Sequence, residues 1–239
     1  MGSLQNQNVV IIGGTSGIGL AAAIIANSAG AKVWAASRSE DRIKLCRANH
    51  KDIYFSQLDT HDVEGLKSLF DSVGNIDHII AAATGADRTI APFMDQTHEQ
   101  FSEAFNKFWG YTHVARQGIP YLSEKGSLTL VSGSPARKYG PNMSALGCTG
   151  GAVENLSRFL AAEIAPKRVN VIAPGTIDTG MWDALPAERR EAMYESAGSR
   201  VPLGRVGTSE EVASSIIHVM TNPYITGATI DVNGGQFLG

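Results

Sequence analysis

Short runs of apolar residues alternate along the chain with longer stretches in which apolar residues recur every three or four positions. The short runs are rich in Val, Ile and Ala, which is typical of buried strands. Six of them are residues 8–13, 31–37, 77–83, 126–133, 169–175 and 227–235. Strands covered on both faces lack a polar alternation, and helical stretches separate these runs. The pattern therefore predicts an α/β fold with a doubly wound parallel sheet flanked by helices.

The chain length predicts a single domain over residues 1–239. A chain of 239 residues with 43% hydrophobic side chains can bury one substantial core. Residues 174–204 form a long segment that connects the last two predicted strands, and the middle of this segment is amphipathic. A segment in such a place often covers a substrate, so we expect a lid around residues 176–204.

Composition and charge exclude several classes of protein. The net charge of -3 and the scattered cations offer nothing to nucleic acid or an anionic membrane. No apolar run approaches the roughly 20 residues of a membrane span, and the N-terminal MGSLQN lacks the features of a secretory signal. Two cysteines, Cys46 and Cys148, suit a reducing compartment. We expect a cytoplasmic protein with no nucleic-acid or membrane partner.

Neither a metal site nor a hydrolase triad is predicted. The six histidines have no metal-ligand spacing, and no Gly-x-Ser-x-Gly is present.

Three glycines, Gly13, Gly17 and Gly19, lie where the first predicted strand runs into a helix, in VVIIGGTSGIGLAAAII. Glycines there let the backbone approach a pyrophosphate, whose charge is favoured by the N–H groups and dipole of the helix N-terminus. This context predicts a dinucleotide site, against a merely structural glycine turn. The Gly-x-x-x-Gly-x-Gly spacing resembles that of the short-chain dehydrogenase/reductase family, which implies a single-domain Rossmann fold.

The resemblance extends over essentially the whole chain. It includes LDTHD with Asp59, RVNVIAPGTIDT, PLGRVGTSEEVASSIIHVM and ITGATIDVNGG. It implies that a nicotinamide dinucleotide is bound by Gly13, Thr15, Ser16, Gly17, Ile18, Gly19, Ser37, Arg38, Ser39, Asp59, Ala82, Pro174, Gly175, Ile177 and Thr179.

The end of the second predicted strand favours NADP(H) over NAD(H). A carboxylate there accepts from the ribose 2′-hydroxyl, whereas a cation accommodates a 2′-phosphate. The sequence has Ser37, Arg38 and Ser39, with no acid before Glu40. Arg38 can pair with a phosphate in a bidentate way. The alternative is an ordinary solvated arginine.

The catalytic positions of the family are where the resemblance fails. Its members use Asn, Ser, Tyr and Lys, with tyrosine as the proton donor. Counting back from Val153 and Glu154 places the tyrosine position at Leu146 and the lysine position at Gly150. The serine position falls on Gly133 and the asparagine position on Lys107.

Residues 81–84, AAAT, likewise replace the Asn-Asn-Ala-Gly of the family. The resemblance thus implies an atypical active site without the Tyr-x-x-x-Lys pair. Tyr121 and Lys125 have that spacing, but they precede the predicted strand at residues 126–133. We therefore interpret them as unrelated to catalysis.

Other residues could replace the missing chemistry. Lys107 could act as the cation and proton donor, its stem filling space left by Gly150, or it could point to solvent. Tyr139 is a second candidate acid, or a packed loop tyrosine. Ser132 and Ser134 could bind a substrate oxygen, or cap the strand end. Leu146, Met181 and Trp182 are expected to line an apolar substrate. Cys148 lies near a helix start and is either a reactive thiol or, as we expect, a small buried hydrophobe.

These observations leave three hypotheses for function. The first is an NADP(H)-dependent oxidoreductase that acts on a carbonyl or conjugated double bond of a hydrophobic small molecule. The second is a repurposed isomerase, cyclase or dehydratase, and the third a cofactor-binding pseudoenzyme. The resemblance also implies a homo-oligomer, a dimer or tetramer, built on the fourth and fifth helices of the family fold, which lie in FNKFWGYTHVARQGIPYL and VENLSRFLAAEIAPKRVN.

Overall fold

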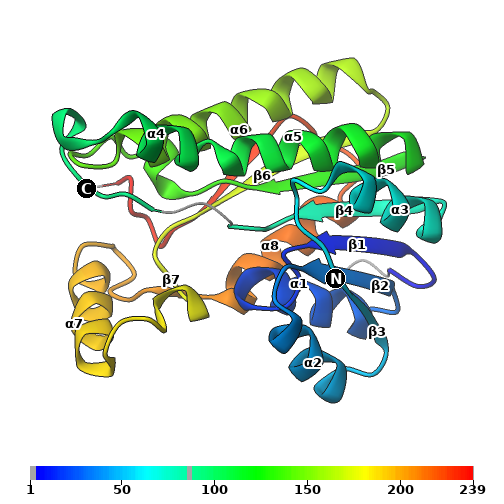
Figure 1. Ribbon diagram of the computed structural model, residues 1–239, viewed down its shortest axis with the longest axis horizontal. Coiled ribbons are helices and arrows are strands. Elements are labelled where there is room, and N and C mark those ends of the chain that lie inside the picture. Colours follow the sequence, from blue (N-terminus) through cyan, green and yellow to red (C-terminus); the bar gives the residue numbers. More distant parts are fainter. Residues whose placement is uncertain (1–3, 85–87, 239) are drawn as a thin grey trace.

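A computed structural model describes residues 4–84 and 88–238, so the expected domain limits 1 and 239 lie outside the described residues. It contains a parallel seven-stranded sheet in the order β3-β2-β1-β4-β5-β6-β9 (Figure 1). The strands are β1 (Asn8–Ile12), β2 (Lys32–Ser37), β3 (Ile53–Gln57), β4 (Ile76–Ala81), β5 (Leu122–Val131), β6 (Arg168–Pro174) and β9 (Thr229–Val232). The predicted α/β architecture is confirmed.

Helices cover both faces of this sheet. They are α1 (Gly17–Ser28), α2 (Glu40–Asn49), α3 (Val63–Val73), α4 (His98–Ala104), α5 (Asn106–Gly118), α6 (Ser144–Glu163), α7 (Ala187–Gly198) and α8 (Ser209–Thr221). Successive residues of β1 face opposite layers: Val9 and Ile11 pack with α1, α2 and α8, whereas Val10 and Ile12 pack with α3, α5 and α6. Burial on both faces explains why the strand is apolar throughout, without alternation.

The edge strand β3 was not among the six predicted strands. Its residues alternate between buried Ile53 and Phe55 and the exposed Tyr54, and its last residue, Gln57, is exposed. Tyr54 stacks on Trp34 of the neighbouring strand, with ring centroids 5.3 Å apart. A search for continuously apolar runs misses such a strand, because one of its faces is polar.

The predicted lid segment lies away from the main sheet. It holds β7 (Ile177–Asp178), a short 3-10 turn η4 (Gly180–Trp182) and α7, and β7 pairs with β8 (Gly207–Thr208) in a separate two-stranded sheet. Figure 1 shows α7 projecting beyond the layers that cover the sheet. Within residues 4–84 and 88–238, no helix is long and apolar enough to cross a membrane.

The strand order reverses between β1 and β4, because the chain builds outward from β1 in one direction and from β4 in the other. Open α/β sheets bind their ligands beyond the carboxyl ends of the strands at this point.

Candidate functional site

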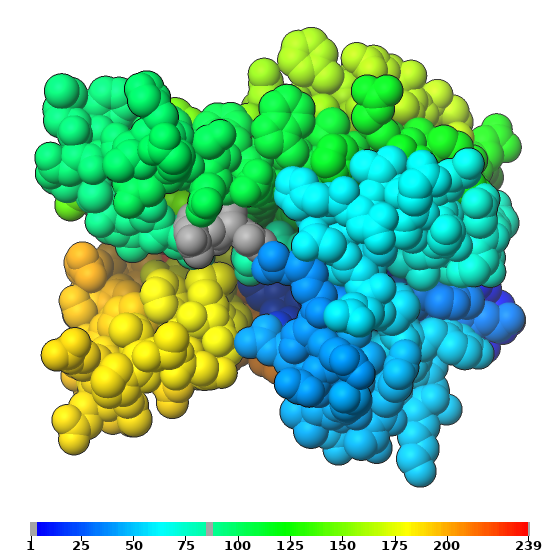
Figure 2. Space-filling view, in the orientation of Figure 1, coloured from blue at the N-terminus to red at the C-terminus, as the bar shows by residue number. Residues whose placement is uncertain are grey.

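A cavity of about 410 Å³ opens where the strand order reverses, and we call it the main cleft. Figure 2 shows the molecule hollowed between the yellow lid segment and the blue N-terminal half. The cleft is lined by Ile12, Gly13, Thr15, Ser16, Gly17, Ile18, Gly19, Ser37, Arg38, Ser39, Arg42, Leu58, Asp59, Thr60, His61, Ala82, Ala83, Thr84, Asn106, Lys107, Tyr111, Val131, Thr179, Gly180 and Met181.

The glycine loop at one end of the main cleft has the geometry of an anion site. Gly13 and Gly17 have φ angles of 93° and 50°, a backbone region that favours glycine. A Cβ on Gly13 would lie 2.5 Å from the backbone nitrogen of Ala83. Residues 17–20, the first turn of α1, include no acid, and Ser16 makes no capping hydrogen bond with its side chain. The N–H groups of this turn therefore face the cleft without a competing carboxylate, which fits a phosphate.

Two arginines lie beside that loop. Thr15 Oγ1 donates to Ser37 Oγ at 2.7 Å, which joins the loop to the end of β2. Arg38 Nη1 lies 3.9 Å from Asp59, and Arg42 Nη1 donates to Ser16 Oγ at 3.3 Å. Sequence reasoning missed Arg42; its signal was its position in the first turn of α2, four residues after Arg38.

Lys107 lies at the opposite end of the main cleft, in the first turn of α5. Its Nζ donates to the carbonyl oxygen of Ser132 at 3.1 Å and lies 5.5 Å from the centroid of the Tyr111 ring. Burial, and next the positive charge of Arg88, lower the pKa of Lys107 to about 7. A lysine with such a pKa can both hold and release a proton near neutral pH.

Tyr111 is a cleft residue that sequence reasoning missed. It follows Lys107 by one helical turn, so both side chains project from the same face of α5. Its hydroxyl donates to the carbonyl oxygen of Val131 at 3.2 Å, and burial raises the pKa of the phenol. Lys107 and Tyr111 thus bind two consecutive carbonyl groups where β5 ends.

The space beside Gly150 is closed, which corrects one expectation. A Cβ on Gly150 would lie 2.7 Å from the Cβ of Ala136 and 3.1 Å from Ser132 Oγ. A Cβ on Gly147 would lie 2.8 Å from the carbonyl oxygen of Pro135. The turn η3 (Ser134–Ala136) therefore packs directly against α6. The expectation that the stem of Lys107 fills space left by Gly150 is wrong, because this turn occupies it.

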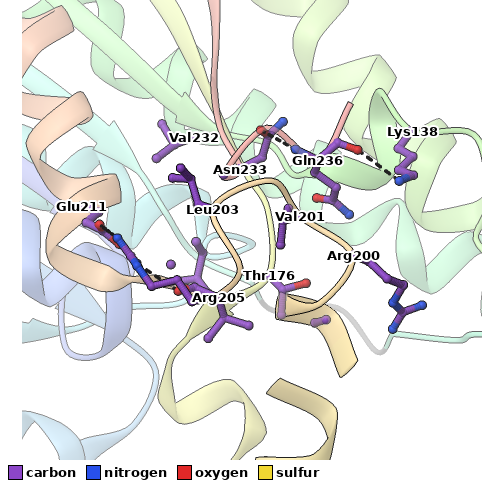
Figure 3. Close-up of a pocket in the computed structure, with 15 residues that line it drawn as sticks. Lys138, Thr176, Arg200, Val201, Leu203, Arg205, Glu211, Val232, Asn233 and Gln236 are labelled. Carbon is purple, nitrogen blue, oxygen red and sulfur yellow. Dashed lines mark hydrogen bonds and ion pairs between the residues drawn. The ribbon is translucent and has the colours of Figure 1, made fainter. Parts of the chain in front are cut away.

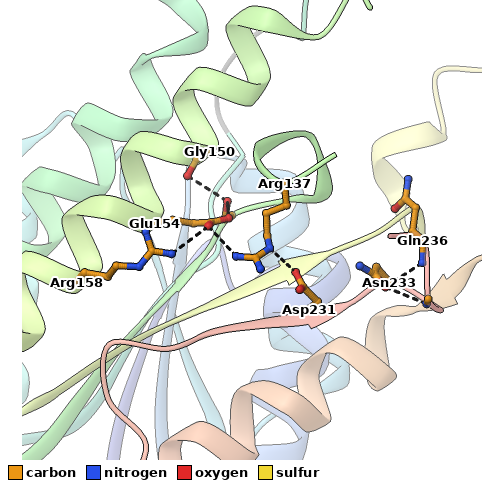
Figure 4. Close-up of polar contacts among 9 residues, drawn as sticks. Arg137, Gly150, Glu154, Arg158, Asp231, Asn233 and Gln236 are labelled. Carbon is orange, nitrogen blue, oxygen red and sulfur yellow. Dashed lines mark hydrogen bonds and ion pairs between the residues drawn. The ribbon is translucent and has the colours of Figure 1, made fainter. Parts of the chain in front are cut away.

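Charged groups hold that turn in place. Arg137 Nη1 lies 3.2 Å from Glu154 of α6, and Arg137 Nε lies 2.9 Å from Asp231 of β9. Figure 4 shows Arg137 between these two carboxylates. Ser132 Oγ donates to the carbonyl oxygen of Gly150 and to Glu154, each at 3.3 Å. Ser132 is thus buried beneath α6 and does not line the main cleft.

The predicted cofactor contacts lie together, with three exceptions. All line the main cleft apart from Pro174, Gly175 and Ile177. Pro174 ends β6, a Cβ on Gly175 would lie 2.9 Å from the Cα of Asn233, and Ile177 lines a second cavity.

The other predicted site residues are dispersed. Met181 lines the main cleft, whereas Leu146, Ser134 and Trp182 do not; the Trp182 indole donates to the carbonyl oxygen of Ile177 at 3.0 Å. Tyr139 is 93% exposed. The Tyr121 hydroxyl donates to Asp71. Tyr121 and Lys125 lie around the amino end of β5, whereas the main cleft lies beyond its carboxyl end.

Cys148 is exposed, so the prediction of a small buried hydrophobe is wrong. Its neighbours Ala145 and Thr149 face the core of the protein, and the helical rotation turns position 148 outward.

A second cavity, of about 280 Å³, lies between the predicted lid segment and the C-terminal segment. Its lining includes Thr176, Ile177, Val201, Leu203, Val232 and Asn233. Figure 3 shows Arg205 paired with Glu211 at one end and Lys138 beside Gln236 at the other. This cavity shares no lining residue with the main cleft among the described residues.

Comparison with known proteins gives consistent matches over the full length. A family model described as Enoyl-(Acyl carrier protein) reductase matches residues 13–236. The chain is 31% identical to the short-chain dehydrogenase/reductase ATR9 of Stachybotrys chlorohalonatus, over 100% of both chains.

Two solved structures are similar as well. The MalC Reductase/Diels-Alderase of Malbranchea aurantiaca has 29% identity and a TM-score of 0.88, with 99% of this chain and 98% of that chain covered. An NADPH-bound short chain oxidoreductase of Pseudomonas aeruginosa PAO1, described as containing an atypical catalytic center, has 28% identity and a TM-score of 0.85. The match covers 97% of this chain and 98% of that one.

Proposed function

Because the chain belongs to the short-chain dehydrogenase/reductase family, we propose that it is an NADP(H)-dependent oxidoreductase with a non-standard proton donor, Lys107. Its substrate is a carbonyl or conjugated double bond in an apolar small molecule. The observation that carries this proposal is the main cleft, which joins the glycine loop at one end to a lysine of lowered pKa at the other.

The residues of the glycine-loop end fit a phosphorylated dinucleotide. The first turn of α1 would bind the pyrophosphate, and Arg38 and Arg42 would bind the 2′-phosphate next to Ser37 and Ser39. The NADPH-bound Pseudomonas structure supports this assignment. NADPH, when bound, supplies the hydride.

We propose further that Leu146 and Gly150 stand where other family members have their tyrosine and lysine. Leucine has no proton to give and glycine has no side chain. Lys107 lines the cleft and, with its lowered pKa, carries a transferable proton near neutral pH. Its ammonium gives that proton to the substrate oxygen that becomes a hydroxyl. The Pseudomonas relative with an atypical center supports a departure of this kind.

A second function is favoured by one relative. MalC is described as a Reductase/Diels-Alderase, so a protein of this fold can combine reduction with a cyclisation. In this alternative the chain is an isomerase, cyclase or dehydratase, with the apolar lid residue Met181 shaping the substrate.

The decisive experiment follows NADPH absorbance with a panel of ketones, enones and oxo acids, and analyses the products. Stoichiometric NADPH oxidation is expected. Lys107→Met should lower turnover by about 100-fold or more, because general acids contribute roughly 10²–10⁴-fold. Lys125→Met is the control, since it removes an exposed lysine at the far end of β5. Product without net NADPH change favours the second function. NADPH binding without turnover on any compound indicates a pseudoenzyme.

We also propose a homo-oligomer built on α5 and α6. Trp109 on α5 is 52% exposed and Phe159 on α6 is 61% exposed. Large aromatic side chains on an open surface are typical of protein interfaces. Light scattering coupled to gel filtration should give a dimer or tetramer, and a monomer would contradict this proposal.

A further inference from the structure

Two cations lie near each other beside the main cleft, because the positive charge of Arg88 contributes to the lowered pKa of Lys107. Arg88 Nη1 donates to the Met181 sulfur at 2.8 Å, and Met181 lines the cleft together with Lys107. Arg88 lies before α4, Lys107 on α5 and Met181 in the lid, so three distant segments converge here.

No carboxylate neutralises either cation among residues 4–84 and 88–238. The ion pairs of this part of the chain include neither Arg88 nor Lys107. Among the described lining residues, Asp59 is the acidic one, and it lies beside Arg38 at the glycine-loop end. Arg88 is exposed and Lys107 is half-buried; burial, and next the positive charge of Arg88, lower the pKa of Lys107, so the two cations lie close enough to repel each other.

Two like charges that lie close together repel each other, and a bound anion would relieve the repulsion. The planar guanidinium of arginine matches the two oxygens of a carboxylate. Met181 adds an apolar surface beside that group. The arrangement therefore suits a small molecule that carries both an anionic head and an apolar body.

We propose that Arg88, near Lys107, forms an anion subsite for the carboxylate of the substrate, which makes the substrate class an apolar oxo acid. This inference rests on the proposed function and names its substrate class. The carboxylate binds Arg88, and the neighbouring carbonyl oxygen lies at Lys107. The carbonyl carbon gains the hydride that NADPH donates, the C=O π bond breaks, and the oxygen takes the proton of the Lys107 ammonium. The products are a hydroxy acid and NADP⁺, and solvent returns a proton to the amine.

A phosphate of the cofactor is the other possible source of an anion, so the test separates the two. Calorimetry measures phenylacetate and phenylacetamide binding to the NADPH-saturated protein, in wild type, Arg88→Met and the control Arg189→Met. Arg189 is an exposed arginine of the lid helix α7. The acid and the amide have similar size and differ in charge.

Wild type should bind the acid about 10-fold more tightly than the amide, as expected for a charge-assisted pair. Arg88→Met should remove that preference and leave the NADPH dissociation constant within about 2-fold, and Arg189→Met should behave as wild type. Equal binding of acid and amide, or no saturable binding of either, overturns the proposal. A fall in NADPH affinity in Arg88→Met also overturns it, because the anion is then a cofactor phosphate.

Failure of the proposed function would look different. If the acid binds through Arg88 but no oxo acid consumes NADPH, the subsite stands and the oxidoreductase assignment fails. If neutral ketones and oxo acids are reduced equally well by wild type and Arg88→Met, the oxidoreductase stands and the subsite is wrong.

Discussion

At the glycine-loop end of the main cleft the lining is largely backbone and small side chains, whereas at the Lys107 end long side chains from three separate segments meet. The first end depends on the φ angles of Gly13 and Gly17 and on the N–H groups of α1. The second depends on Arg88, Lys107 and Met181. A backbone site accepts many neighbouring side chains. A side-chain site changes its chemistry with each substitution, and it is at this end that we propose a departure from the family pattern.

The contrast between side-chain and backbone surfaces also holds for the two sides of the Lys107 end. On the α5 side, Lys107 and Tyr111 occupy space and bind the end of β5. On the α6 side, Gly147 and Gly150 let the turn η3 lie against the helix, where Arg137 holds it. One helix thus supplies functional groups, and the other supplies a close backbone surface.

The largest expected effect is at the glycine loop. Gly13→Ala places a Cβ 2.5 Å from the backbone of Ala83, at a φ of +93°. NADPH affinity, measured by fluorescence titration, should fall by about 100-fold or more, since neither backbone can move cheaply. The control is Gly74→Ala, which has a φ of +77° but nothing within 4 Å of the added Cβ. It should cost about 1 kcal/mol of stability and leave NADPH affinity unchanged. Equal NADPH affinities in the two variants would show that the loop does not bind the cofactor.

The next effect is the pH dependence set by Lys107. In the proposed function its ammonium is the proton donor, so reductive kcat/KM should fall about tenfold per pH unit above a pKa of about 7. Lys107→Arg keeps the charge but does not titrate, so its residual activity should be flat over this range. Steady-state kinetics of wild type and Lys107→Arg from pH 5.5 to about 9 would test both pH profiles. An unchanged basic limb in Lys107→Arg would mean that another group supplies the proton.

The same pKa shift predicts the sign of a stability change. The folded protein binds fewer protons at Lys107 than the unfolded chain does between pH 7 and the ordinary value of 10.5. The contribution of Lys107 to the free energy of unfolding should therefore rise as the pH increases from 7 to about 10.5, and it should be lowest below pH 7. Lys107→Met should remove this contribution.

A smaller effect is expected on stability when either of two adjacent glycines of α6 is replaced by alanine. Gly150→Ala should cost about 1–3 kcal/mol, because its Cβ would lie 2.7 Å from the Cβ of Ala136. Gly151→Ala meets nothing within 4 Å and should stabilise the helix by up to about 1 kcal/mol. Denaturant unfolding measures both. Equal changes would show that η3 does not pack closely on α6, and the space at Gly150 would again be open to a longer side chain.

The smallest expected effect concerns the choice of coenzyme. Arg42→Leu should lower the preference for NADPH over NADH by roughly 10-fold, as for the loss of one charge-assisted contact to phosphate. Lys44→Leu, which removes an exposed cation of the same helix that pairs with Glu40 at 2.9 Å, should leave the preference unchanged. Parallel titrations with the two coenzymes test this. Identical ratios in both variants would place the 2′-phosphate away from Arg42.

The sequence was informative where the relevant residues are contiguous. The six apolar runs gave six strands, and the glycine loop lies where its pattern placed it. The sequence was uninformative about β3, because one side of an edge strand is polar, and misleading about Cys148, because the rotation of α6 about its own axis depends on what packs against it.

The sequence by itself thus determined the α/β architecture, the positive-φ glycines and the absence of an acid at the end of β2. These features follow from local backbone geometry and from the period of apolar residues. The tertiary structure alone decided that η3 closes the space beside Gly150, that Tyr111 faces the cleft and that Arg88 contacts Met181, which lines the same cleft as Lys107. The physical reason is that these groups are brought together by the strand order of the sheet and by the packing of loops and helices on it, which no stretch of consecutive residues encodes.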